Sequence, residues 1–320
     1  MIDDNVKMYL KCYKDHLIRH AQDETERELV ARCMDRLLND DVEGLEQEIL
    51  DTITETATPI QCLLLCIVYF IKERYGSGYE MVAKALAINP DFVPAMNIYA
   101  EVKILDKNYL EAIVTLQKSI RFDPDQFQAR HLLGEIFRDS RQYERALQVL
   151  DPLRETIPEN SDLWVWLREC HKAVGTLSLF ENHLLDAVEA NPECFVVWFH
   201  LGYHYADISR LEDALQAFKR ANELWPNDAS ILSNMGQTYQ RMGNLEAAIQ
   251  LYRRATRLRP DHAISWMNLA SALFLLEREN EEYQDALRRV AELNPDIMKR
   301  ATYYRIDDGM AVDSTYRGEG

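Results

Sequence analysis

The sequence predicts an all-α solenoid of about seven helix hairpins, because one spacing recurs along three quarters of the chain. Seven of the ten prolines follow one another at five intervals of 34 residues and a last interval of 35: Pro90, Pro124, Pro158, Pro192, Pro226, Pro260 and Pro295. Small residues and helical apolar stripes recur with the same period. A fixed period of this length is typical of stacked repeats, in which each unit buries its apolar face against its neighbours.

Seven repeats of two helices each fit residues 59–296 when every proline is placed at position 32. The repeats begin at Pro59, Val93, Phe127, Ser161, Phe195, Ala229 and Ala263. Small residues share two positions, glycine at position 8 and alanine at position 20: Gly134, Gly202 and Gly236, then Ala112, Ala146, Ala214 and Ala248. We expect them where the two helices of a repeat approach closely.

The fifth repeat shows how one unit forms two helices. Its apolar and small residues recur at a helical period in both halves: Trp198, Leu201, Gly202 and Tyr205, then Leu211, Ala214, Phe218 and Ala221. The first helix should end near Ser209 and Arg210. The second should end near Trp225, because Pro226 cannot continue a helix and forces the preceding residue out of the α region.

This pattern resembles the tetratricopeptide-repeat family. The fifth repeat matches its signature at all eight marked positions: Trp198, Leu201, Gly202, Tyr205, Ala214, Phe218, Ala221 and Pro226. The sixth matches nearly as well, whereas the fourth has Arg168 and Phe180 where small residues belong. The resemblance implies a right-handed superhelix. It also implies a concave groove, lined by the first helix of each repeat, that generally binds peptides or protein surfaces.

Residues 1–58 are expected to form an N-terminal helical cap or a degenerate repeat, since an uncapped solenoid exposes its terminal apolar face. Three amphipathic stripes predict three helices: Val6, Tyr9, Leu10, Tyr13 and Leu17; Leu29, Val30, Cys33 and Leu37; Leu45, Ile49 and Ile53. We expect these helices to cover the apolar residues Leu63, Ile67, Phe70 and Ile71 of repeat one. The alternative is an open hydrophobic pocket for a partner helix.

The other end of the chain, residues 297–320, should hold a short capping helix and then a flexible tail. Ile297 to Tyr304 could form the helix, and the glycine-rich segment from Arg305 to Gly320 offers little apolar surface on which to fold. Pro152 lies inside the predicted second helix of repeat three and should kink it.

Composition argues against several classes of protein. A net charge of −17 disfavours binding to nucleic acid or anionic membranes. The longest nearly uninterrupted apolar stretch, Cys62 to Ile71, is about half of the roughly twenty residues that a membrane span needs. The N-terminus is acidic, unlike a signal peptide, and six cysteines are too few for a disulfide scaffold. We therefore expect a cytoplasmic protein with reduced thiols.

Catalytic and cofactor motifs are not recognisable, so we expect neither an enzyme nor a cofactor site. Histidines at i, i+4 spacing occur twice, as His16 with His20 and as His200 with His204. Each pair lacks a third ligand nearby in sequence, so we expect no metal site. Cysteines and tryptophans at packing positions should be core residues: Cys62, Cys66, Trp164, Trp198 and Trp266.

Two groups of residues stand at positions that face the groove in this family. The first is an acidic ladder at position 9 of repeats two to four, Glu101, Glu135 and Glu169, which would attract a basic peptide segment. Alternatively, Glu135 with Arg138 and Glu169 with Lys172 form ordinary i, i+3 surface pairs.

The second group joins aromatic and amide side chains of repeats four to seven: Trp166, Phe199, His200, Tyr203, Asn234 and Asn268. Aromatic rings offer large contact area at low entropic cost, and an asparagine amide can bond to an extended backbone. The arrangement is similar to the asparagine ladders of some family members. Packing of Trp166 and Phe199 between helices is the alternative.

These features predict a non-catalytic adaptor or scaffold that holds a peptide segment or partner protein in its groove. Two alternatives stay open. The solenoid could self-assemble through apolar residues of its last repeat: Ile264, Met267, Phe274 and Leu275. It could also be the regulatory subunit of a separate enzyme.

Overall fold

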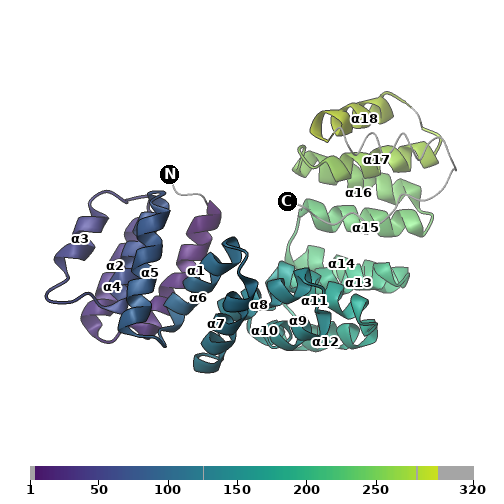
Figure 1. Cartoon of the computed structure of the whole chain (residues 1–320). Coiled ribbons are helices and arrows are strands. Elements are labelled where there is room, and N and C mark those ends of the chain that lie inside the picture. The colour runs from purple at the N-terminus through teal and green to yellow at the C-terminus, as the bar shows by residue number, and fades with distance from the viewer. Residues whose placement is uncertain (1–3, 125, 279, 295–320) are drawn as a thin grey trace. The chain divides into compact units, whose positions relative to one another are not determined.

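Helix hairpins follow one another along the chain, as the 34-residue period predicted (Figure 1). A computed structural model describes residues 4–124, 126–278 and 280–294, and within these ranges it contains helices and no β-strand. The chain divides into two compact parts, an N-terminal body of residues 1–153 and a C-terminal body of residues 154–320.

The N-terminal body holds the cap and the first repeats. The cap helices are α1 (Asp4–His20), α2 (Glu24–Leu38) and α3 (Leu45–Asp51). Three hairpins follow: α4 (Pro59–Ile71) with α5 (Tyr75–Ile88), α6 (Val93–Leu105) with α7 (Tyr109–Phe122), and α8 (Phe127–Asp139) with α9 (Tyr143–Leu150). The short helix α10 (Leu153–Thr156) follows and contains the boundary between the two bodies. Pro152 therefore interrupts the second helix of repeat three rather than kinking it, because proline lacks the N–H that the helix needs.

The C-terminal body contains four further hairpins. They are α11 (Ser161–Ala173) with α12 (Leu177–Ala190), α13 (Phe195–Asp207) with α14 (Leu211–Leu224), α15 (Ala229–Arg241) with α16 (Leu245–Leu258), and α17 (Ala263–Leu275) with α18 (Glu281–Leu293). In the fifth repeat the two helices end within two residues of the predicted points. The predicted capping helix and tail at residues 297–320 lie outside the described residues.

Every repeat turns from its first helix to its second through a residue with positive φ. These residues recur at position 15, with φ between 54° and 81°: Glu73, Lys107, Arg141, Gly175, Ser209, Gly243 and Glu277. Only two of the seven are glycine, the residue that adopts this conformation without steric cost. The hairpin geometry therefore holds five other residues in a conformation that each disfavours.

Close approach between the helices of a repeat explains the glycines at position 8. A Cβ atom added to Gly202 would stand 2.7 Å from Phe218, and one added to Gly236 would stand 2.6 Å from Tyr252. Real Cβ atoms do not come so near other carbon atoms. The expectation of tight helix contact at this position is confirmed.

The cap helices cover repeat one, as expected. Leu63 and Ile67 of α4 are buried in one core cluster with Tyr13 and Leu17 of α1 and with apolar residues of α2. The Tyr13 hydroxyl donates a hydrogen bond to the backbone oxygen of Pro94 over 3.0 Å. Helix α1 thus lies beside α6 (Figure 1). Cys62, Cys66 and Trp164 are fully buried, which confirms their prediction as core residues. Trp198 and Trp266, predicted to be core residues as well, are only partly buried.

In the described part of the chain, every helix is too short or too polar to cross a lipid bilayer.

Candidate functional site

First helices of successive repeats contact one another within each body. Such contacts join α4 with α6 and α6 with α8 in the N-terminal body, and α11, α13, α15 and α17 in turn in the C-terminal body. Residues at the same position of neighbouring first helices therefore come close in space. The residues at position 9 of α6 and of α8 therefore lie in the same region of the N-terminal body.

Glu101 of α6 and Glu135 of α8 line one cleft of about 640 Å³. The remaining lining residues come from α6, α7, α8 and the turn that follows α8: Ile104, Leu105, Tyr109, Ile113, Leu132, Ile136, Asp139, Ser140 and Gln142. Two rungs of the predicted acidic ladder thus lie at a single cleft. The apolar residues beside them were not predicted as part of the site.

The apolar wall of this cleft is open to solvent. Leu105 is 73% exposed and Tyr109 is 48% exposed. Leu110 and Val114, on α7, are exposed as well. Exposed apolar patches of this kind are typical of interaction surfaces on folded proteins.

Glu135 is the electrostatically unusual residue of the cleft. Partial burial of its carboxyl group, and secondarily the charge of Asp139, raises its pKa, while Arg138 opposes that shift. Arg138 donates instead to Asp139, over 2.8 Å. Among the described residues Glu135 has no hydrogen-bonded or ion-paired partner, so the expected Glu135–Arg138 pair does not form.

Glu101 is held in place by a polar network between α6 and α8. Gln128 donates to the Glu101 carboxylate over 2.7 Å. Asn97, fully buried, donates to the side-chain oxygens of Gln126 over 2.6 Å and Gln128 over 3.3 Å. The Ser119 hydroxyl donates to Asn97 over 2.6 Å. A satisfied network of this kind fixes the orientation of its members. This network was not predicted from the sequence; Asn97, an amide on a largely apolar helix, is the signal that could have indicated it.

In the C-terminal body, two of the predicted site residues are buried. His200 is 5% exposed, and its Nε2 atom lies 2.9 Å from the Ser161 hydroxyl. Burial, and then the charge of Arg168, lowers the pKa of His200 to about 3, so the ring is neutral at neutral pH. Asn268 is 6% exposed, and its amide nitrogen lacks a hydrogen-bond partner within the described ranges.

Tyr203 belongs to a charged cluster on α11 and α13. The Arg168 guanidinium lies 4.7 Å from the centre of the Tyr203 ring and forms an ion pair with Asp207 over 2.5 Å. Arg168 occupies position 8, where repeats three, five and six have glycine. In repeat four, the close contact between the two helices of one repeat is therefore replaced by a bridge from Arg168 that joins the first helices α11 and α13.

The remaining predicted site residues of the C-terminal body contact different groups from one another. Phe199 packs on Phe218, with ring centres 5.8 Å apart, so its packing alternative holds in part. Asn234 donates to the Ser230 carbonyl of its own helix over 2.9 Å. Trp166 and Glu169 are partly buried. None of the predicted site residues lines the cleft between the turns at Pro158 and Pro192 of this body.

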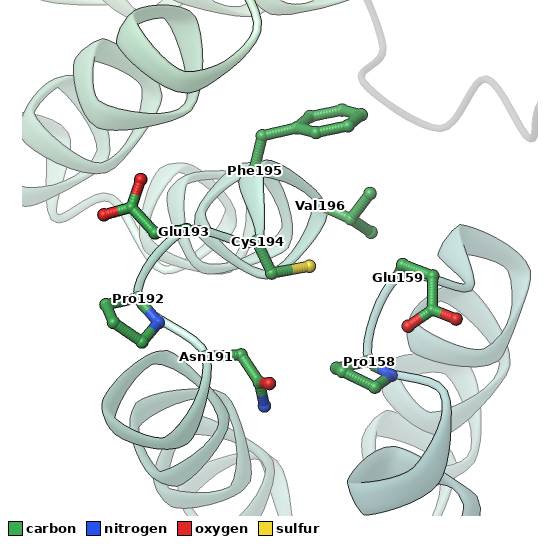
Figure 2. A pocket seen from close by; sticks show the side chains of 8 residues that line it. All are labelled: Pro158, Glu159, Asn191, Pro192, Glu193, Cys194, Phe195 and Val196. Atoms are coloured by element: carbon green, nitrogen blue, oxygen red, sulfur yellow. The ribbon is translucent and has the colours of Figure 1, made fainter.

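This cleft of the C-terminal body has a volume of about 440 Å³ and lies between two turns that join successive repeats. Figure 2 shows Asn191 and Cys194 on one side and Pro158 with Glu159 on the other. Pro158 and Pro192 occupy the same position of successive repeats. This cleft is therefore a consequence of repeat spacing, and the acidic apolar cleft between α6, α7 and α8 is the better candidate site.

Family comparison agrees with the repeat pattern. Two models of the tetratricopeptide repeat match residues 193–261 and 234–296. These ranges include repeats five to seven almost completely. A search of curated protein sequences returns no match.

Three similar solved structures are described as tetratricopeptide-repeat proteins. YrrB, described as a TPR protein with an unusual peptide-binding site, is 23% identical over 58% of this chain and 96% of its own, with a TM-score of 0.42. TTC0263, a TPR protein of Thermus thermophilus, is 21% identical over 57% and 99%, with a TM-score of 0.43. A tetratricopeptide repeat protein from Parabacteroides merdae is 13% identical over 78% and 100%, with a TM-score of 0.49.

Proposed function

We propose that this chain, which is a tetratricopeptide-repeat protein, is a non-catalytic interaction scaffold whose acidic apolar cleft binds a partner segment carrying a lysine or arginine beside apolar side chains. The observation that carries the proposal is the position of Glu101 and Glu135 at one cleft, next to the exposed side chains of Leu105 and Tyr109.

Electrostatics favours a basic group in this cleft. Burial penalises the charged form of the Glu135 carboxyl group, and the charge of the nearby Arg138 offsets that penalty only in part. A lysine or arginine from a partner would supply further positive charge, and charge-assisted hydrogen bonds to a carboxylate are among the stronger polar contacts. Glu101, oriented by Gln128, offers a second acceptor one repeat away.

Apolar contact would supply much of the affinity. A partner side chain that covers Leu105 and Tyr109 removes their apolar surface from water, at about 25 cal/mol for each Å² buried. The volume of about 640 Å³ fits a few side chains of a helical or extended segment rather than a folded domain.

A peptide display experiment tests the proposal. Short random peptides selected on the full chain should be enriched in sequences that place lysine or arginine beside leucine, isoleucine or phenylalanine. Binding of the selected peptides, measured by fluorescence anisotropy, should fall at least about tenfold in the Glu101→Gln, Glu135→Gln double variant.

The control is Glu189→Gln, which removes one charge from an exposed position of α12 in the other body. It should leave peptide affinity nearly unchanged. Selection of acidic peptides, or equal affinity for the double variant and the wild type, would contradict a basic partner at this cleft.

We propose the first helices of the C-terminal body as a second contact surface. Trp166, Phe199, Tyr203 and Asn234 are partly exposed there and could contact a partner directly. The buried His200 and Asn268 would act behind them as positioning residues, since His200 joins α13 to α11 through Ser161. The third acidic rung, Glu169, lies on the same helix as Trp166 and would bind basic groups at this surface.

Self-assembly is a second candidate function that one observation favours. Phe274 and Leu275, at the end of α17, are 43% and 54% exposed. Light scattering over a range of protein concentrations tests it, because association through these residues requires a mass that rises with concentration. The Leu275→Glu variant should then remain monomeric.

A further inference from the structure

A cluster of metal-binding side chains lies apart from the cleft, where the last turn of α1 meets the end of α7. His16 and His20 stand one helical turn apart on α1, and Asp123 is the residue that caps the C-terminus of α7. One potential ligand atom from each of the three lies within 4.8 Å of the other two. The third ligand that the sequence did not provide near the histidine pair therefore comes from repeat two.

A backbone contact fixes the tautomer of the His20 ring. Its Nδ1 atom lies 2.9 Å from the backbone oxygen of His16, a contact in which Nδ1 carries the proton and donates. The Nε2 atom is then left with its lone pair available. A backbone carbonyl that fixes the tautomer in this way is the usual outer partner of a metal-binding histidine.

His16 faces both other groups from a buried position. It is 7% exposed, its ring centre lies 4.6 Å from that of His20, and its Nδ1 atom lies 4.0 Å from a carboxylate oxygen of Asp123. Its Nε2 atom is buried without a hydrogen-bond partner within the described residues. One nitrogen of this buried ring thus lacks a partner, although most buried polar side-chain atoms in proteins have one.

The geometry suits a small metal ion after a modest adjustment. Donor atoms around a tetrahedral zinc ion lie about 3.3 Å apart, given metal–ligand distances near 2.0 to 2.1 Å. The His16 Nδ1 atom and the Asp123 carboxylate oxygen, now 4.0 Å apart, would therefore have to come closer on metal binding. Two imidazoles and one carboxylate are a ligand set that zinc, cobalt and nickel accept.

One cation competes for this space. The Arg19 guanidinium lies 3.4 Å from His16 Nδ1, so it would oppose a bound cation and occupy the face of a ligand atom. Arg19 is an exposed residue, and its side chain can turn away into solvent. Its presence predicts that removing it strengthens metal binding.

We propose that His16, His20 and Asp123 bind one divalent transition-metal ion, zinc above all, with solvent completing the coordination. The ion joins α1 of the cap to the end of α7 in repeat two. It adds to the Tyr13–Pro94 hydrogen bond, which connects α1 with the start of α6. An ion that binds only the folded arrangement stabilises it as metal concentration rises.

Zinc titration of the full chain, first freed of metal with a chelator, tests this site. Isothermal calorimetry should show a saturable site that depends on His20 and Asp123, and Co²⁺ should give the visible absorption of a tetrahedral complex. His20→Gln and Asp123→Asn should each lower the affinity at least about tenfold, whereas Arg19→Gln should raise it. Zinc should raise the melting temperature of the wild type but not of Asp123→Asn.

His204→Gln is the matched control, since His200 and His204 have the same i, i+4 spacing and, in the described ranges, no group that completes a three-ligand cluster with them. It should bind zinc as the wild type does, with folding of all variants checked by circular dichroism. Three results would overturn the site: no saturable binding, unchanged affinity in His20→Gln and Asp123→Asn, or equal loss in His204→Gln.

Discussion

The indole nitrogen of Trp198 donates a hydrogen bond to the backbone oxygen of Pro192 over 2.9 Å. The same bond recurs one repeat earlier, from Trp164 to Pro158 over 2.8 Å, and two repeats later, from Trp266 to Pro260 over 2.9 Å. The proline at the repeat boundary thus ends one helix and also provides the acceptor for a tryptophan of the next repeat. This bond gives the tryptophan at position 4 a role that packing alone does not explain.

Replacing Trp198 with phenylalanine should therefore weaken the fold even though an aromatic ring remains. Loss of one hydrogen bond costs about 1 kcal/mol of unfolding free energy, measured by urea denaturation. Trp225→Phe serves as the control, because Trp225 is 54% exposed and stacks on Phe195 through its ring. Equal losses in both variants would show that the bond to Pro192 contributes nothing.

The turns with positive φ predict that two substitutions, one to glycine and one from glycine, change stability in opposite directions. Lys107→Gly should stabilise the protein by up to about 1 kcal/mol, because glycine adopts the φ of 61° without steric cost. Gly243→Ala should destabilise it by about 1 kcal/mol, although a Cβ there would have open space around it. Thermal unfolding measures both, and a stabilising Gly243→Ala would refute the backbone explanation.

Gly202→Ala should destabilise the protein through a different cause, the contact with Phe218. Overpacking of this kind costs about 1 to 3 kcal/mol. Gly76 of α5 is the matched control, since a Cβ there meets no atom within 4 Å. Alanine at position 76 should stabilise its helix by about 0.5 to 1 kcal/mol. Pairing Gly202→Ala with Phe218→Leu should recover part of the loss, which a double-mutant cycle can measure.

The raised pKa of Glu135 predicts a pH-dependent gain from neutralising it. Its carboxyl group is harder to ionise in the folded chain than in the unfolded one, so the charged form destabilises the fold above the folded-state pKa. That penalty disappears as the pH falls through the folded pKa towards the ordinary value for glutamate. Glu135→Gln should thus raise the melting temperature at pH 7, with a difference from wild type that shrinks on acidification.

A stabilising Glu135→Gln that also weakens peptide binding would identify Glu135 as a residue kept at a cost to stability. Thermal scans of both proteins between neutral and acidic pH provide the comparison. An identical melting temperature at every pH would mean that the carboxyl group is as well solvated in the folded chain as in the unfolded one.

The sequence by itself determined the repeat boundaries and the helices. Proline restricts its own backbone and that of the preceding residue, so Pro226 predicted the end of α14 without knowledge of any other helix. Apolar spacing likewise predicted the cap helices, because side chains three and four residues apart share one face of a helix. Both signals act within a few residues along the chain.

Tertiary structure alone decided which of these side chains are accessible and which meet. His200 and Asn268 stand at family positions that face the groove, yet neighbouring helices bury both. Glu135 lies beside Leu105 because α6 and α8 pack together, and Asp123 reaches His16 because α1 folds back onto repeat two. Periodicity specifies the face of a helix, whereas burial and ligand geometry depend on side chains contributed by helices that are distant in sequence.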